Sequence, residues 1–142
     1  MRLLLAAILS LGLLTACATT PEAVAEPGLK RRWMLVEWPA SQLYPPAAQA
    51  RLDLRSLPNA SAFMGCNQLK LQVAVRNPRQ AGGTLDIRPG GATRMHCNGR
   101  MALEQAFIRQ IGRFKHYRLA GHRLTLEDAA GNTIRLIAED WD

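Results

Sequence analysis

The chain has 142 residues, 48% hydrophobic and 20% charged, and its 18 Lys and Arg exceed its 11 Asp and Glu to give a formal charge of +7. This length suits a single domain and excludes two independent enzyme domains. The hydrophobic and charged fractions allow a buried core and exclude a disordered polymer. Three Cys are too few for a disulfide-dense miniprotein or an iron–sulfur array.

The first sixteen residues predict a signal peptide that is not part of the fold. Arg2 gives a basic start, the apolar run 3–14 follows, and small residues precede Cys17. This is the layout of a secretory signal and its cleavage site. The apolar run is about a dozen residues, whereas a membrane-spanning helix needs roughly 20.

Cys17 stands where a bacterial lipoprotein carries its acylated first residue. Leu14-Thr15-Ala16-Cys17 resembles the lipobox, and an ordinary signal peptide needs no Cys at this point. We therefore expect residues 1–16 to be removed and lipid to be attached to Cys17, where several acyl chains anchor a protein stably. Loss of Arg2 leaves a mature chain of +6. By analogy with other lipoproteins, Ala18 in place of Asp favours the outer membrane.

Residues 17–29 predict a lipidated N-terminus followed by a flexible tether. The segment is poor in large apolar residues and contains two Pro, which is typical of an extended linker. Lys30, Arg31 and Arg32 come next. These cations either remain solvated or contact anionic lipid head groups close to the anchor.

From residue 30 onward, most of the chain has a hydrophobic period of two, which predicts β-strands. The segment Trp33–Trp38 is apolar on both faces except at Glu37, so we expect a more central strand there. Ala129 to Asn132 separates two strand-like segments and predicts a hairpin. Pro-containing segments, including Pro89-Gly90-Gly91, are expected to be loops. Apolar and polar residues alternate in four further segments, around 51–55, 69–76, 85–87 and 123–127.

One segment departs from this pattern. Apolar residues recur at spacings of three and four from Leu103 to Phe114, which predicts an amphipathic helix over about 100–114. Asn98 is the expected N-cap, and Glu104 suits the positive end of the helix. The expected fold is mainly β, in the α+β class: an antiparallel, barrel-like sheet with this helix packed on it or closing an opening.

Three short motifs, in this order along the chain, carry a resemblance to a known family. Gly65-Cys66-Asn67 follows a predicted strand, Thr93-Arg94-Met95-His96-Cys97 comes just before the predicted helix, and Glu104 lies within that helix. Trp33 begins the domain in a Trp-x-Leu sequence. Together they resemble the META domain family, which includes the HslJ-like heat-shock lipoproteins of the bacterial envelope. The resemblance covers about residues 29–138, and we place the domain at 30–138.

This resemblance implies a small β-rich module without established enzymatic activity, linked to envelope stress tolerance and antibiotic resistance. We expect no cofactor and no metal. Two features depart from the family pattern. Leu69-Lys70-Leu71 stands where the family often has Gly and an aromatic residue, and the loop from Asn77 to Gly83 is longer than usual.

Cys66 and Cys97 remain as a pair once Cys17 carries lipid. In an exported, oxidising compartment such a pair is expected to form a disulfide, here closing a loop of about 30 residues. Three alternatives remain open: two free thiols, a metal site with His96, or a catalytic pair of Cys66 with His96. Metal binding would need further ligands, and a catalytic thiol would compete with the disulfide for the same sulfur.

Arg94 and Glu104 are predicted to form an ion pair that orients the loop carrying Cys97. In the alternative interpretation, Arg94 binds an anion at a cleft. The three histidines, His96, His116 and His122, are scattered along the chain and form no recognisable triad or ligand set.

We therefore expect an outer-membrane lipoprotein that faces the periplasm and serves as a non-catalytic stress-tolerance or binding module for an unidentified envelope protein or ligand. The alternative is a small β-barrel lipoprotein that inhibits a cell-wall hydrolase or protease, although a +6 domain would be repelled by strongly basic lysozymes. An enzyme would need a convergent acid, base or nucleophile set. A nucleic-acid partner is not expected, because basic strand faces with few aromatics do not match such a module.

Overall fold

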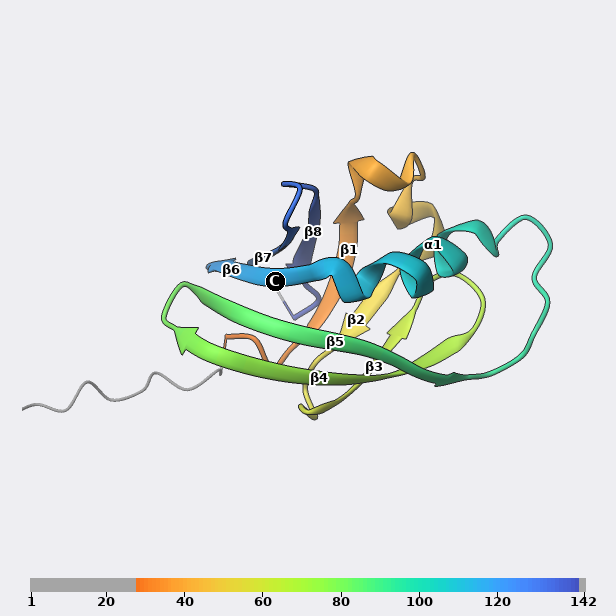
Figure 1. The fold of residues 1–142 in the computed structure, drawn as a ribbon. Coiled ribbons are helices and arrows are strands. Elements are labelled where there is room, and N and C mark those ends of the chain that lie inside the picture. The colour runs from red at the N-terminus through yellow and green to blue at the C-terminus, as the bar shows by residue number, and fades with distance from the viewer. Residues whose placement is uncertain (1–27, 141–142) are drawn as a thin grey trace, which may run out of the picture.

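The structure is a computed structural model that describes residues 28–140. Its eight strands form a closed barrel in chain order (Figure 1). Each strand pairs antiparallel with the next, and β8 pairs with β1 to close the barrel. The prediction of a mainly β, antiparallel, barrel-like fold is therefore confirmed. The strands are β1 (Arg32–Glu37), β2 (Arg51–Asp53), β3 (Asn59–Phe63), β4 (Gln68–Arg79), β5 (Gly82–Ala92), β6 (Phe114–Ala120), β7 (Arg123–Asp128) and β8 (Thr133–Ala138).

The barrel interior is filled by every second residue of its strands. On β1, Trp33 and Leu35 are buried, whereas Met34 between them is 41% exposed. The expectation of a more central strand, covered on both faces, is therefore wrong for β1. A closed barrel has one interior, so each of its strands keeps an outer face toward solvent.

The hairpin of β4 and β5 runs through two prolines that were expected to interrupt strands. Pro78 lies within β4, and Pro89 lies within β5 opposite Leu71. The pairing register shifts between Leu69 and Leu71, next to Pro89, and again near Pro78. Such irregularities allow a strand to pass a residue that has no N–H to donate to the ladder.

The helix α1 (Ala102–Gln110) is shorter than the predicted segment 100–114. A 3-10 helix follows at Ile111–Arg113, and Phe114 already begins β6. The expected cap at Asn98 is wrong: Met101 precedes the helix, and no side chain caps it. Asn98 lies too far before the first helical turn, where its Oδ1 is 2.9 Å from Nε2 of His96 instead.

The helical segment occupies the position that further β5–β6 pairing would take. These strands pair only through Gly82–Thr84, while the 3-10 helix lies against β5 near Ile87 (Figure 1). A Cβ at Gly112 would come within 3.4 Å of the Ile87 carbonyl oxygen. Leu103 and Phe107 of α1 belong to the single core cluster. The helix therefore completes the core as well as covering the sheet.

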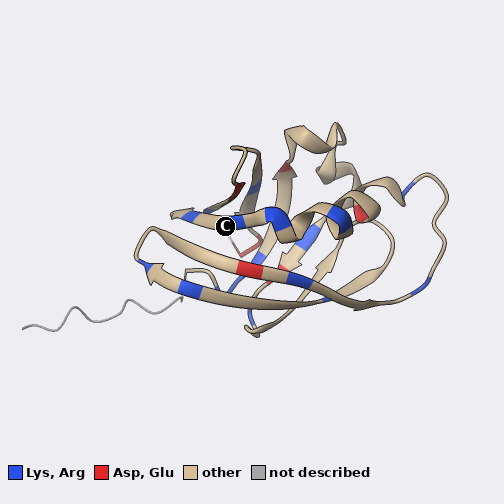
Figure 2. Ribbon diagram, viewed as in Figure 1, with Lys and Arg blue, Asp and Glu red and all other residues tan. Residues whose placement is uncertain are grey.

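Lys and Arg lie on most elements of the barrel, which leaves the surface strongly basic (Figure 2). The predicted signal peptide 1–16, the lipid attachment at Cys17 and nearly all of the tether 17–29 lie outside the described residues. No helix within residues 28–140 is long and apolar enough to span a bilayer.

Candidate functional site

Asn67 and Glu104 form the centre of the motif region, and both are almost fully buried, at 3% and 4% exposure. The backbone N–H of Asn67 donates to Oε2 of Glu104 at 2.7 Å. The side-chain amide of Asn67 donates to Oε1 at 2.9 Å. Both carboxylate oxygens therefore accept hydrogen bonds, which a buried carboxylate requires. This contact links the residue just before β4 to the first turn of α1.

The side-chain amide of Asn67 also holds the segment that precedes the helix. Its Oδ1 accepts from the Met95 N–H at 2.6 Å and from the Thr93 hydroxyl at 3.0 Å. Its Nδ2 also donates to the Met95 carbonyl at 3.1 Å. Thr93 accepts in turn from the N–H of Gln68 at 3.0 Å. One side chain thus fixes the loop, the strand and the helix relative to one another.

A disulfide joins Cys66 to Cys97 beside this network. The predicted disulfide is therefore confirmed. Both sulfurs are bonded, so the free-thiol, Cys66–His96 catalytic and metal alternatives are not supported in this oxidised form. In the part of the chain that the structure describes, no three His, Cys, Asp or Glu side chains gather as a metal site would require.

The predicted ion pair between Arg94 and Glu104 is wrong. Arg94 is exposed, and no ion pair joins it to Glu104, whose two oxygens both accept from Asn67. A guanidinium reaching this buried carboxylate would itself lose its hydration, whereas the amide and N–H of Asn67 satisfy the carboxylate without burying a second charge.

Gly65 and Trp33 also have structural roles. Gly65 has a φ of +110°, and a Cβ there would lie 3.1 Å from Cβ of Ala48. A side chain would therefore be strained in both backbone and packing. Trp33 is fully buried, and its indole N–H donates to the Leu29 carbonyl at 2.9 Å. Among the motif residues, Trp33, Gly65, Cys66, Asn67 and Glu104 thus serve internal contacts, whereas the side chains of Arg94 and Met95 are exposed.

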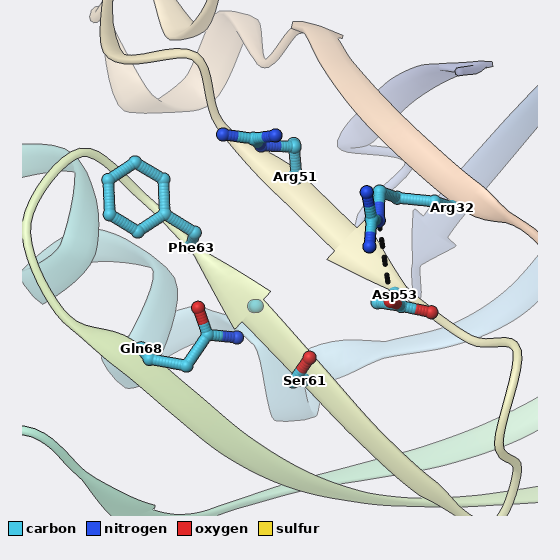
Figure 3. A pocket seen from close by; sticks show the side chains of 7 residues that line it. Arg32, Arg51, Asp53, Ser61, Phe63 and Gln68 are labelled. Atoms are coloured by element: carbon cyan, nitrogen blue, oxygen red, sulfur yellow. Dashed lines mark hydrogen bonds and ion pairs between the residues drawn. The ribbon is translucent and has the colours of Figure 1, made fainter. Parts of the chain in front are cut away.

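A polar pocket on the outer wall of the barrel was not predicted from the sequence. It has a volume of about 230 Å³ and lies across β1 to β4 (Figure 3). We call it the wall pocket. Its lining residues are Arg32, Arg51, Asp53, Ser61, Ala62, Phe63 and Gln68.

Two guanidinium groups dominate the wall pocket. That of Arg51 lies 5.8 Å from the centroid of the Phe63 ring, a cation–π contact. Both arginines reach the same carboxylate, Glu139, with N–O distances of 3.3 Å from Arg32 and 3.5 Å from Arg51. Arg32 also lies 3.4 Å from Asp53. The pocket is thus lined by cations that are only partly neutralised by long ion pairs.

The Asp53 carboxylate stays ionised over nearly the whole pH range. Hydrogen bonds from the Arg55 guanidinium lower the pKa of Asp53 to about 2, against the opposing effect of partial burial. The shortest of these contacts is 2.6 Å, from Nη2 of Arg55. The alternation around Leu52 predicted that Arg51 and Asp53 face outward. Only the register of Arg51 with Phe63 shows which side chains become neighbours.

The sequence model of the META domain matches residues 27–141. The chain belongs to the META domain family. The fold of this META domain is similar to that of a protein from Burkholderia xenovorans solved by NMR, with a TM-score of 0.64 and 21% identity. The alignment covers 79% of this chain and 83% of that chain, and at this identity it shows the fold alone. The comparison with curated proteins gave no match.

Proposed function

We propose that this protein is a lipid-anchored, HslJ-like envelope protein whose META domain binds a partner and catalyses no reaction. The observation that carries this proposal is the use of the motif residues in internal contacts. Glu104 and Asn67 are buried and hydrogen-bonded to each other, and Cys66 is bonded to Cys97. A general base or nucleophile must reach its substrate, and these groups do not.

The wall pocket supports the binding role. Guanidinium groups bind carboxylates and phosphates with paired hydrogen bonds, and Arg51 is already oriented against Phe63. Ser61 and Gln68 add groups that donate and accept hydrogen bonds. A volume of about 230 Å³ suits one small group, such as the acidic side chain or terminus of a larger partner. We therefore assign the wall pocket to a carboxylate-bearing ligand.

The proposed location is the periplasmic face of the outer membrane. The signal-like segment 1–16, Cys17 in its lipobox-like sequence and the following Ala18 support it. A disulfide between Cys66 and Cys97 is also expected of an exported domain. A role in envelope stress tolerance follows from the resemblance to HslJ-like proteins and belongs to the same proposal.

Capture of partners from the cell envelope tests the binding role. The full-length protein and its Arg51→Gln variant are used as baits, and Arg135→Gln serves as the matched control. Like Arg51, Arg135 lies on a strand and forms an ion pair, here with Glu37, but it does not line the wall pocket. We expect the captured partner to be lost with Arg51→Gln and retained with Arg135→Gln. Equal capture by both variants contradicts a role for the pocket.

The competing function is inhibition of a cell-wall hydrolase or protease. The purified protein is added to such enzymes and their residual activity is measured. Inhibition by the wild type that is weakened in Arg51→Gln would favour the inhibitor function over a stress-tolerance module. Turnover of a substrate by the purified protein itself would contradict the non-catalytic proposal.

A further inference from the structure

One end of the barrel gathers cations from separate segments of the chain. Lys and Arg lie at the turn between β4 and β5, at the end of β6 and near the start of the described chain (Figure 2). We call this region the basic end. It comprises Lys30, Arg31, Arg76, Arg79, Arg118 and Arg123.

Contacts between these segments show that they share one end of the barrel. The Leu119 N–H on β6 donates to the Ala81 carbonyl in the β4–β5 turn at 2.9 Å. Arg118 lies opposite Gly82 in the ladder. A Cβ at Gly28 would lie 3.4 Å from the Leu119 side chain. The first described residue therefore lies beside the ends of β4 and β6.

The remaining cations are placed by strand register. Arg123 begins β7 opposite Ala120, at the end of β6. Arg76 lies opposite Thr84, close to the β4–β5 turn, and Arg79 lies at that turn. All of these strands start or finish at the same end of the barrel, so their cations gather around that end.

The positive charge of the basic end is only partly balanced by ion pairs. Arg118 pairs with Glu127 at 3.0 Å, and Arg31 pairs with Asp140 at 3.6 Å. Within residues 28–140, Arg76, Arg79 and Arg123 form no ion pair and are exposed. The positive charge of these three arginines would favour an anionic surface.

The chain enters the fold at this same end. Leu29 is fully buried, and its carbonyl accepts hydrogen bonds from Trp33 and from the Arg31 N–H. Cys17 is separated from Gly28 by only ten residues. Even a fully extended chain from Cys17 to Gly28 reaches no more than about 40 Å. A lipid on Cys17 would therefore keep the basic end within that distance of the bilayer.

We infer that the basic end docks on the anionic phospholipid surface to which the protein is anchored. This inference rests on the proposed lipid attachment at Cys17. The anchor makes docking intramolecular, which raises the effective concentration of head groups. Each cation near an anionic leaflet favours docking by about fivefold. The loop 93–101 follows the opposite end of β5, so docking turns it and its Arg94 and Arg100 away from the lipid.

Amide hydrogen exchange on the full-length lipidated protein tests this orientation. The protein is reconstituted into phosphatidylcholine vesicles with and without phosphatidylglycerol, after mass spectrometry has established the acyl chains on Cys17. The test variant is Arg76→Gln/Arg79→Gln. The matched control is Arg94→Gln/Arg100→Gln, which removes the same charge at the opposite end of β5.

We expect phosphatidylglycerol to slow exchange in the β4–β5 turn of the wild type and of the control. The test variant should lose this protection, because two cations together change docking by about 30-fold. Added salt should reverse the protection by screening. Equal exchange in both kinds of vesicle, equal loss in both variants, or protection of the loop 93–101 instead would each overturn the inference.

Failure of the anchor is distinguishable from failure of the docking surface. If mass spectrometry finds no acyl chain, the proposed lipid attachment is wrong, and the same chains are then added to preformed vesicles. Binding to phosphatidylglycerol vesicles that is weakened only in Arg76→Gln/Arg79→Gln would still support the basic end. Binding that is absent, or weakened equally in both variants, would overturn it.

Discussion

The Asn67 side chain shows why the motif requires an amide at this position. Its Nδ2 donates to Glu104 and to the Met95 carbonyl, while its Oδ1 accepts from the Met95 N–H and the Thr93 hydroxyl. An ionised Asp has no donor and would bring a second buried carboxylate next to Glu104. The amide therefore suits its surroundings both as a hydrogen-bond donor and as an acceptor.

Removal of Glu104 should be much more damaging than removal of Arg94. Glu104→Ala leaves the backbone N–H of Asn67 and one of its two amide N–H groups without an acceptor, so we expect the free energy of unfolding to fall by about 2–3 kcal/mol. Arg94→Ala removes an exposed side chain with no ion pair to Glu104 and should change it by about 0.5 kcal/mol or less. Urea denaturation of both variants measures the difference. Similar losses would contradict the buried network.

Asp53 should contribute a small, pH-dependent stabilisation. The pKa of Asp53 is about 2 in the folded protein, below the value of about 4 in an unfolded chain. Its contribution is therefore present above pH 4 and is lost as the pH falls toward 2. Because the side chain is partly exposed, we expect no more than about 1 kcal/mol. The difference in unfolding free energy between wild type and Asp53→Asn, followed over this pH range, should shrink on acidification; a constant difference would contradict the assignment.

At the scale of elements, the disulfide and the Asn67 network fasten α1 to the strand end before β4. The helix has nine residues and no side-chain cap, and a helix of that length is marginal on its own. Its stability must come from Leu103, Phe107 and the attachment of the preceding loop. The bond between Cys66 and Cys97 spans 31 positions in the sequence and provides part of that attachment.

Replacement of both Cys66 and Cys97 by Ser should lower the free energy of unfolding by about 2–4 kcal/mol. For a domain of this size, that corresponds to a melting temperature lower by roughly 5–15 °C. The single variants should be no more stable than the double variant, since each loses the same bond and leaves a thiol free to mispair. Alkylation of the exported wild type without reductant provides the check, because free modification of both thiols would show that the bridge is absent.

At the scale of the whole molecule, closure of the barrel depends on β1 meeting β8. Trp33 pairs with Ala138 and Leu35 with Leu136, more than a hundred positions away along the chain. The same closure brings Glu139 to Arg32 and Arg51, two of the residues that line the wall pocket. Barrel closure and the placement of these two arginines therefore depend on the same long-range pairing.

The location of the whole protein gives a further prediction. We expect the wild type to incorporate palmitate and to fractionate with the outer membrane, since Cys17 is followed by Ala18. Cys17→Ser should abolish labelling, because the acyl thioether forms only on Cys, and should yield a soluble or unprocessed chain. Labelling that persists in Cys17→Ser would contradict the lipobox. Recovery of the wild type only with inner-membrane markers would contradict the choice of membrane.

Local patterns in the sequence were sufficient for several strands but not for all of them. Alternation from Leu69 to Val75 predicts β4 because Leu69, Leu71 and Val73 fill the interior and Val75 packs against it. The segment Asn59–Phe63 has no such alternation of large residues, and it forms β3 by pairing with β2 and β4. Phe114 continued the helical spacing, yet it begins β6. Neighbouring strands can override local preference in this way because pairing energy is non-local.

The sequence by itself determined the class of fold, the family and the Cys66–Cys97 pair, because these depend on residue type, period and spacing. Tertiary structure alone decided that Glu104 pairs with Asn67 rather than Arg94, and that Arg51 lies over Phe63. Partners of this kind are set by strand register and by burial. Register and burial are decided only when distant segments come together. The free energy of a polar contact then depends on which groups lose their hydration with it.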